Sequence, residues 1–373
     1  MAAHRAEETV RRLFKEAGIQ IYGKNPWDIQ VKDSRFYERV LRDASLGLGE
    51  SYVDGWWEVE SIDGMVERML RARLDKKVRG DVRALMPALL GRLTNRQAPS
   101  RAFEVGEEHY DLGNDLYTAM LDRRLNYACA YWKNASNLDE AQEAKLDLVC
   151  RKIGLQPGMH VLELGCGWGA FAKYAAEKYG VSVVGVTVSK EQVALGSEWV
   201  KGLPVELRLQ DYRTVEGRYD RVISIGMMEH VGYKNYRTYM EVVDRTLKPD
   251  GVGFIQTIGG NESQTAGDPW SDRYIFPNGM LPSIAQLGAA MEGLFVMEDW
   301  HNFGPDYERT LLAWHDNFEA AWPELSKKYS ERFHRMWRYY LLNSAGAFRA
   351  RSQQLWQIVF TRTGTPQPDS RVG

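Results

Sequence analysis

Four short apolar segments alternate with helical patterns in the second half of the chain, and this alternation constrains the fold most strongly. The segments are His160–Gly167, Val181–Val188, Tyr219–Gly226 and Gly251–Gly259, and each is apolar and rich in β-branched residues. Buried strands that alternate with helices build a doubly wound, mostly parallel sheet. We therefore predict an α/β, Rossmann-like domain in this part of the chain.

The first hundred residues differ from the rest and predict a small, mainly helical domain. Residues 64–101 carry ten basic and three acidic residues, a net charge of +7, with apolar residues at mostly helical spacing. This basic segment is either a solvated helix face leading into a linker or a helix that meets anionic lipid headgroups. Turn-forming residues at 93–100 (LTNRQAPS) predict a domain boundary, so we expect domains at 1–100 and 101–373.

Composition excludes several classes of protein. The 48 basic and 50 acidic residues give a net charge of −2, which disfavours a nucleic-acid binder. No window approaches the roughly 18 apolar residues of a membrane-spanning helix, and the charged N-terminus does not resemble a signal peptide. Three cysteines do not make a disulfide scaffold. These features predict a soluble cytoplasmic protein that meets a membrane only at its surface.

A glycine turn follows the first predicted strand and reads ELGCGWG over residues 163–169. Its G-x-G-x-G spacing differs from the dinucleotide pattern and lets backbone approach a ligand at the carboxyl end of the strand. Glu163 can hold this loop or reach an ammonium group, and Asp211 can accept from an exocyclic amine. Both carboxylates suit S-adenosylmethionine, whereas a pyrophosphate favours a loop poor in carboxylates.

The end of the second predicted strand, GVTVS over residues 185–189, lacks an acidic residue that could bind ribose hydroxyls. The amide of Gln192 can do so instead. Ser189 and Gln192 also fit a helix capping box, so Ser189 is interpreted as the N-cap and Gln192 can serve in both roles.

The chain resembles the bacterial cyclopropane-fatty-acyl-phospholipid synthases over roughly residues 10 to 362. The resemblance rests on motifs in a shared order: GLGESYVDGWW, EHYDLGND, NYACAYW, LELGCGWG, VVGVTVSKEQ, LQDYR, MMEHVG, RYIFPNG, DWHNFG, DYERTLLAW and FRARSQQLWQ. It implies an S-adenosylmethionine-dependent methyltransferase that adds a methylene group to a cis double bond of a phospholipid acyl chain. The related mycolic-acid cyclopropane synthases lack a domain like residues 1–100, so the phospholipid branch is favoured.

The implied reaction passes through a carbocation on the acyl chain, and the family's base is a bound bicarbonate ion. The resemblance places the cradle of this ion on Cys129, Glu229, Tyr307 and the backbone of Ile258. Glu229 must share the bicarbonate proton or be protonated, because two adjacent anions repel. Facing aromatic rings can stabilise the cation, and the resemblance nominates as pocket walls Tyr233, Tyr236, Tyr274, Phe276 and Tyr307.

Gln256 departs from the family pattern, which has His at this position of the cradle. A glutamine amide can donate a hydrogen bond but cannot carry a positive charge or relay a proton. The departure puts the strength of bicarbonate binding in question. The adjacent His230 is interpreted as structural.

The resemblance also implies the contacts to S-adenosylmethionine, and no metal ligand is expected. The cofactor-binding residues are Tyr127, Ala128, Gly165, Gly167, Thr187, Val188, Gln192, Gln210, Asp211 and Tyr212. Packing is the expected role of Cys166, Trp168 and Cys150.

The substrate lies inside a bilayer, which requires the enzyme to dock on the membrane, and we expect peripheral association with its inner face. The basic segment suits anionic lipids, and residues 348–362 (FRARSQQLWQIVFTR) are a second candidate surface. The resemblance implies a homodimer. The alternatives are a methyltransferase that alkylates a carbon of the acyl group and gives a branched or hydroxylated product, a small-molecule N-methyltransferase, and a non-catalytic lipid-binding protein.

Overall fold

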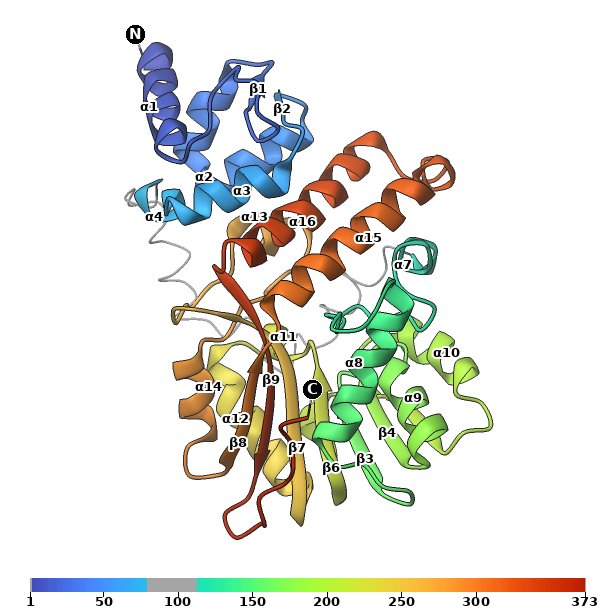
Figure 1. The fold of residues 1–373 in the computed structure, drawn as a ribbon. Helices are drawn as coiled ribbons and strands as arrows, with labels where there is room; N and C mark the ends of the chain where they lie inside the picture. The colour runs from blue at the N-terminus through green and yellow to red at the C-terminus, as the bar shows by residue number, and fades with distance from the viewer. Residues whose placement is uncertain (1, 79–112, 373) are drawn as a thin grey trace. The chain divides into compact units, whose positions relative to one another are not determined.

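The computed structural model describes residues 2–78 and 113–372, which fall into two compact units (Figure 1). The first unit comprises residues 1–94, 266–277 and 307–353, and the second comprises residues 95–265, 278–306 and 354–373. The predicted boundary at 93–100 and the basic residues beyond 78 lie outside the described residues. The domain division therefore stays a prediction.

The first unit is mainly helical, as predicted. Residues 2–78 of its N-terminal part hold four helices and a two-residue strand pair: α1 (Ala2–Glu16), β1 (Gln30–Val31), α2 (Arg35–Val53), β2 (Trp57–Glu58), α3 (Ile62–Arg71) and α4 (Leu74–Val78). Later segments add α13 (Pro269–Tyr274), most of α15 (Gly304–Leu325) and α16 (Glu331–Arg349). The sequence did not predict that these later helices complete the unit.

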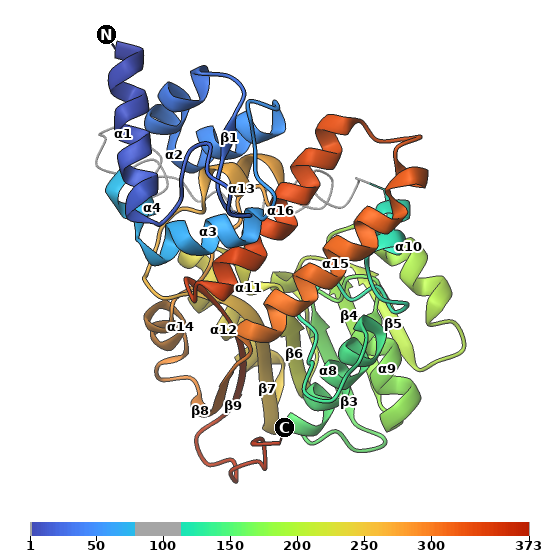
Figure 2. The same cartoon turned by 45° about the horizontal axis from the view of Figure 1, so that its top comes forward.

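Two glycines allow close helix packing inside the first unit. Helix α16 runs beside α3 (Figure 2), and a Cβ on Gly346 would press against the backbone of Asp63 and the side chain of Val66. A Cβ on Gly49 of α2 would likewise overlap the indole ring of Trp270 in α13. Both contacts require a residue without a side chain.

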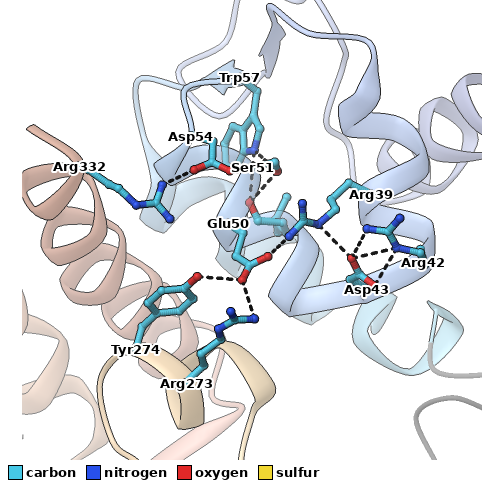
Figure 3. Close-up of polar contacts among 11 residues, drawn as sticks. Arg39, Arg42, Asp43, Glu50, Ser51, Asp54, Trp57, Arg273, Tyr274 and Arg332 are labelled. Atoms are coloured by element: carbon cyan, nitrogen blue, oxygen red, sulfur yellow. Dashed lines mark hydrogen bonds and ion pairs between the residues drawn. The ribbon is translucent and has the colours of Figure 1, made fainter. Parts of the chain in front are cut away.

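A buried carboxylate joins α13 to α2 in the same unit (Figure 3). Glu50 is 4% exposed, pairs with Arg39 of its own helix and accepts from Arg273 Nη1 at 3.1 Å and the Tyr274 hydroxyl at 2.8 Å. Helix α2 is interrupted at Ala44, whose φ is 48°. The predicted pocket wall Tyr274 therefore has its hydroxyl engaged by Glu50.

The second unit is built on a seven-stranded sheet of order β5-β4-β3-β6-β7-β9-β8. The strands are β3 (His160–Leu164), β4 (Ser182–Thr187), β5 (Val205–Leu209), β6 (Tyr219–Ile225), β7 (Leu247–Gly260), β8 (Val296–Asn302) and β9 (Gln353–Thr361). Strands β3 to β7 pair in parallel along β5-β4-β3-β6-β7, while β8 and β9 are antiparallel. The four predicted strands correspond to β3, β4, β6 and β7, which confirms the doubly wound α/β prediction.

Helices cover both faces of this sheet (Figure 1). One core packs Leu162, Leu164 and Val222 with α12 (Tyr236–Thr246) and α14 (Ile284–Met291). The other packs Val161 and Ile223 with α8 (Leu138–Lys152) and α9 (Ala170–Tyr179). Alternate residues of each strand thus serve opposite cores, because successive strand side chains point to opposite faces. The remaining elements are α7 (Asn114–Met120), α10 (Lys190–Trp199), η3 (Tyr212–Thr214), α11 (Met228–Val231) and η4 (Tyr233–Asn235).

The C-terminal segment 348–362, a predicted membrane surface, is largely an interior strand in the structure. Trp356 of β9 is 2% exposed and packs on Trp300 with ring centroids 5.1 Å apart, and Gly259 of β7 makes room for it. Arg349 pairs with Asp63 at 2.7 Å and with Glu308 at 2.7 Å. The prediction of membrane docking through Trp356 is therefore wrong, because this side chain is buried in a core of the second unit. Within residues 2–78 and 113–372, no helix has the length and apolar character to span a bilayer.

Candidate active site

A cavity of about 180 Å³ opens at the carboxyl ends of β3, β4 and β6. Parallel sheets of this kind bind ligands at that edge. Nine of the ten predicted cofactor-binding residues line the cavity: Tyr127, Ala128, Gly165, Gly167, Thr187, Val188, Gln192, Gln210 and Tyr212. The structure therefore gathers residues from segments almost 90 positions apart into one pocket.

The glycine turn forms the floor of this cavity in a conformation that suits glycine. Gly165, Gly167 and Gly169 have φ values of 77°, 55° and 86°, a region that other residues adopt at a cost. A Cβ on Gly165 would lie 3.2 Å from the sulfur of Met227, whereas a Cβ on Gly167 would meet no atom within 4 Å. The turn thus exposes backbone toward the cavity.

The end of β4 presents an amide in place of the usual acidic residue. The backbone N–H of Gln192 donates to Ser189 Oγ at 3.3 Å, which confirms Ser189 as the N-cap of α10. The Gln192 side chain accepts from Thr187 Oγ1 at 2.7 Å. This bond holds the Gln192 amide at the cavity wall, where its NH₂ group can meet a ligand hydroxyl.

Asp211 is the predicted cofactor contact that does not line the cavity. Its carboxylate accepts from the Arg213 guanidinium at 2.6 and 2.9 Å and from the Arg213 backbone N–H at 2.9 Å. Its neighbours Gln210 and Tyr212 face the cavity instead. The carboxylate of Asp211 thus caps η3, and its contact with a cofactor stays a prediction.

Lys145 also lines the cavity, and the sequence analysis missed it. Its amine is buried and donates to Asn126 Oδ1 at 2.8 Å. Burial lowers the pKa of Lys145 to about 8, against the attraction of Asp122, Cys129 and Glu163. The available signal was a charged residue on the apolar face of α8, four positions after Ala141 and before Val149.

Glu163, near the end of β3, is another buried ionisable side chain that lines the cavity, besides Lys145. It is 2% exposed, and its Oε2 has no hydrogen-bond partner among the described residues. Burial raises the pKa of Glu163 to about 8, while Lys145 pulls it down. An unsatisfied carboxylate oxygen at the glycine turn is the feature expected of a group that awaits a cationic ligand.

Glu229 in α11 is a second buried carboxylate, and a backbone N–H of β7 donates to it. The N–H of Ile258 in β7 donates to Glu229 Oε1 at 2.6 Å. Its Oε2 is buried without a partner in the described part of the chain. Burial raises the pKa of Glu229 to about 7, so an appreciable fraction of this group is protonated at neutral pH.

Cys129 and Gln256, two residues that the sequence analysis assigned to the cradle, contact each other, and the cradle itself stays a prediction. Gln256 Nε2 donates to the backbone oxygen of Cys129 at 3.4 Å, and the Cys129 thiol points to the backbone oxygen of Ala130 at 3.2 Å. His230 lines the cofactor cavity, and burial lowers its pKa to about 4. The imidazole is therefore neutral at physiological pH.

Tyr307 belongs to the first unit, where it contacts Trp314 and Phe348 with ring centroids 6.0 and 4.7 Å away. Tyr274 and Phe276 belong to that unit too. Tyr236 is buried in a sheet core of the second unit, and Tyr233 packs against the same core. The placement of Tyr307 in the cradle and the aromatic pocket walls stay predictions.

Comparisons with known proteins match most of this chain to one family. Residues 97–358 match the family model described as mycolic acid cyclopropane synthetase. The cyclopropane-fatty-acyl-phospholipid synthase of Escherichia coli strain K12 is 54% identical over 350 residues, which cover 94% of this chain and 92% of the relative. Two solved structures each cover 70% of this chain and 98% of their own. They are the cyclopropane synthase MmaA2 of Mycobacterium tuberculosis (31% identity, TM-score 0.66) and the mycolic acid cyclopropane synthase CmaA1 complexed with SAH and CTAB (33% identity, TM-score 0.65).

Proposed function

This chain belongs to the mycolic acid cyclopropane synthetase family, and we propose that it transfers a methylene group from S-adenosylmethionine to the cis double bond of a phospholipid acyl chain, which closes a cyclopropane ring. The extent of the match to the Escherichia coli synthase carries this proposal. A match over 94% of the chain must include most of residues 1–96, which precede the family model. The two solved structures, MmaA2 and CmaA1, instead cover 70% of the chain.

The cavity fits S-adenosylmethionine. The exposed backbone of the glycine turn, the unsatisfied Oε2 of Glu163 and the amide of Gln192 offer partners for an amino acid moiety and a ribose. Bound S-adenosylmethionine supplies an electrophilic methyl group to the double bond. The residues of this chain hold that group in place, and the neutral His230 adds no competing positive charge beside it.

The second carboxylate, Glu229, suits an anion cradle together with Ile258, Cys129 and Gln256, and the family resemblance adds Tyr307 to this proposal. Bicarbonate, when bound, supplies the base that takes the surplus proton from the carbocation on the acyl chain. A protonated Glu229 can donate to such an anion, because burial raises its pKa to about 7. The Ile258 N–H, which now donates to Glu229, must be shared with that anion.

These residues must also exclude water from the site, because water converts a carbocation into an alcohol. Cys129, Glu229 and Gln256 are each at most 8% exposed. A dry, largely uncharged cradle therefore favours deprotonation and ring closure over hydroxylation.

A second candidate function is methylation of a carbon atom of the acyl chain. Its product is a branched or hydroxylated chain instead of a cyclopropane. Gln256 favours this alternative, because an amide cannot relay a proton. If deprotonation is slow, the cation is diverted before the ring closes. The lipid products separate the two functions directly.

We also propose that the enzyme works as a homodimer at the inner membrane surface, with residues 1–100 forming a lipid-docking domain and residues 101–373 the catalytic domain. The buried position of the acyl chain in a bilayer supports surface docking, and anionic headgroups suit the basic segment. Within its described part, Arg71 pairs with Glu67 at 2.8 Å and Lys77 pairs with Glu16 at 2.5 Å. These pairs reduce the charge available for headgroups.

The decisive experiment incubates the purified protein with S-adenosylmethionine and vesicles of cis-monounsaturated phospholipid, with and without bicarbonate. Mass spectrometry and proton NMR read the acyl chains. Chains heavier by one CH₂ with upfield ring protons support the cyclopropane synthase, whereas branched or hydroxylated chains support the second function. Unchanged lipid despite cofactor binding refutes both, and a parallel reaction with soluble amines then tests N-methylation.

A further inference from the structure

Two buried glutamines on adjacent strands form a directed relay of hydrogen bonds that ends at the candidate anion cradle. Gln256 of β7 and Gln357 of β9 are each 1% exposed. Gln357 Nε2 donates to Gln256 Oε1 at 3.0 Å, and Gln256 Nε2 donates to the backbone oxygen of Cys129 at 3.4 Å. The hydrogen bonds therefore run from Gln357 through Gln256 to Cys129.

The direction of these hydrogen bonds follows from the backbone group at their end. A carbonyl oxygen can only accept, so the Gln256 atom that faces Cys129 must be its NH₂ group. The Gln256 oxygen then faces Gln357, which must present its own NH₂ group. A side chain at 357 that only accepts would reverse the Gln256 amide and turn an oxygen toward Cys129.

Gln256 contacts residues that line the active-site cavity or directly follow residues that line it. Its backbone oxygen accepts from Gly226, a cavity residue, at 2.9 Å. Cys129 directly follows two cavity residues, Tyr127 and Ala128. Within the described residues, the amide NH₂ of Gln256 has one acceptor, the Cys129 carbonyl, although it carries two hydrogens.

We propose that Gln357 is a positioning residue that fixes the Gln256 amide so that a neutral N–H donor, rather than a carbonyl oxygen, faces the anion cradle. This inference rests on the proposed function and adds a residue to it. Such a donor keeps its hydrogens at every physiological pH, unlike an imidazole. Gln357 therefore acts on the anion through Gln256.

The test measures the KM for bicarbonate and kcat for the intact enzyme on phospholipid vesicles. Gln357→Met removes the donor at similar length, and we expect the KM for bicarbonate to rise about tenfold. Gln357→Glu should raise it further, because a carboxylate accepts from the Gln256 amide and reverses it. When Gln256→Met is also present, Gln357→Met and Gln357→Glu should have nearly the same KM for bicarbonate, because the amide through which residue 357 acts is gone.

Gln354→Met is the matched control, because Gln354 is a buried glutamine of the same strand that bonds Asn302 and Asn261. It should leave the KM for bicarbonate within about twofold of the wild-type value. Thermal melting of every variant separates misfolding from a change in the cradle. The inference would be overturned if Gln357→Met and Gln357→Glu raised the KM for bicarbonate equally, or if neither variant changed it.

The wild-type enzyme distinguishes this inference from the proposed function. A wild type that makes no cyclopropane lipid refutes the proposed function itself. A wild type that makes the ring without any response to bicarbonate refutes the cradle, and this inference with it. A bicarbonate-dependent wild type with insensitive variants refutes only the role of Gln357.

Discussion

The backbone N–H of Ile258 donates to Glu229 Oε1 at 2.6 Å, while the other carboxylate oxygen of Glu229 stays buried without a partner in the described part of the chain. This bond fixes the direction of the carboxyl group, and the hydrogen bonds that Glu229 receives do not offset the cost of burying its charge. Burial consequently raises the pKa of Glu229 to about 7. A group that ionises near neutral pH can exchange a proton with a bound anion.

Replacing Glu229 with Gln should reduce kcat for cyclopropane formation at least about a hundredfold. The amide can still accept from the Ile258 N–H, but it can no longer exchange a proton. Turnover on vesicles at saturating bicarbonate measures the change. Glu298→Gln is the matched control, since Glu298 is a buried carboxylate of edge strand β8 that accepts from Thr361 at 2.6 Å. A loss of similar size in the control would contradict the role of Glu229.

Glu229 should also make the stability of the enzyme depend on pH. The folded pKa of about 7 lies above the ordinary value of 4.5, so the folded state holds more protons than the unfolded state between these values. The stability that Glu229 contributes is complete below pH 4.5 and is lost as pH rises to 7. Glu229→Gln lacks this pH dependence. Its free energy of unfolding relative to the wild type should therefore increase by up to about 3 kcal/mol as pH rises through this window. Urea denaturation at about pH 5 and about pH 7.5 measures it, and a constant difference would refute the raised pKa.

Lys145 is expected to support cofactor binding through Glu163. Burial already raises the pKa of Glu163 to about 8 with Lys145 present. In Lys145→Met the pKa rises further, so ionising Glu163 to meet a cationic ligand costs more, and S-adenosylmethionine should bind about tenfold more weakly at neutral pH. Calorimetric titration at about pH 7 measures this loss, and affinity should partly recover at about pH 9 as Glu163 ionises.

Lys152→Met is the control for this prediction, because Lys152 is the second buried lysine of α8 and pairs with Asp299 at 2.6 Å outside the cavity. It should lower stability without changing cofactor affinity. Equal loss of affinity in both variants would show that the effect on binding is only structural.

The sequence was most informative where the residues of the candidate site lie within short motifs. The glycine turn, the strand ends and the motif around Cys129 each carry recognisable residues, and the structure gathers nine of the ten predicted cofactor residues in one cavity. Asp211 is the exception, because Arg213, two positions later, engages its carboxylate. Arg213 is part of the LQDYR motif, but the motif does not show that its guanidinium pairs with Asp211.

The sequence was least informative about contacts between distant segments. Strand β9 looked like a basic, Trp-containing surface, yet its apolar residues lie between β7 and β8. The helices that complete the first unit come from positions 266–277 and 307–353, more than 170 residues after its N-terminal part. Periodicity describes which face of a helix is apolar but does not name the partner that covers it.

Glu50 should be a major source of stability in the first unit. It is buried between Arg39 of α2 and Tyr274 of α13, and Arg273 adds a more exposed partner (Figure 3). Glu50→Ala leaves the partly buried Arg39 without this counter-charge and removes the acceptor of the Tyr274 hydroxyl. We expect a loss of about 2–4 kcal/mol in the free energy of unfolding, measured by urea denaturation, with faster amide exchange in α13.

Asp54→Asn is the matched control for Glu50, because Asp54 pairs with Arg332 at the surface of the same unit (Figure 3). Arg332 is 54% exposed in its side chain and Asp54 33%, compared with 6% for Glu50. Exposed pairs contribute little because solvent screens them, so this variant should change stability by about 0.5 kcal/mol or less. If both variants lose the same stability, burial does not set the strength of these pairs. If only Glu50→Ala is destabilised and α13 alone exchanges faster, the carboxylate of Glu50 is what fastens the 266–277 segment to α2.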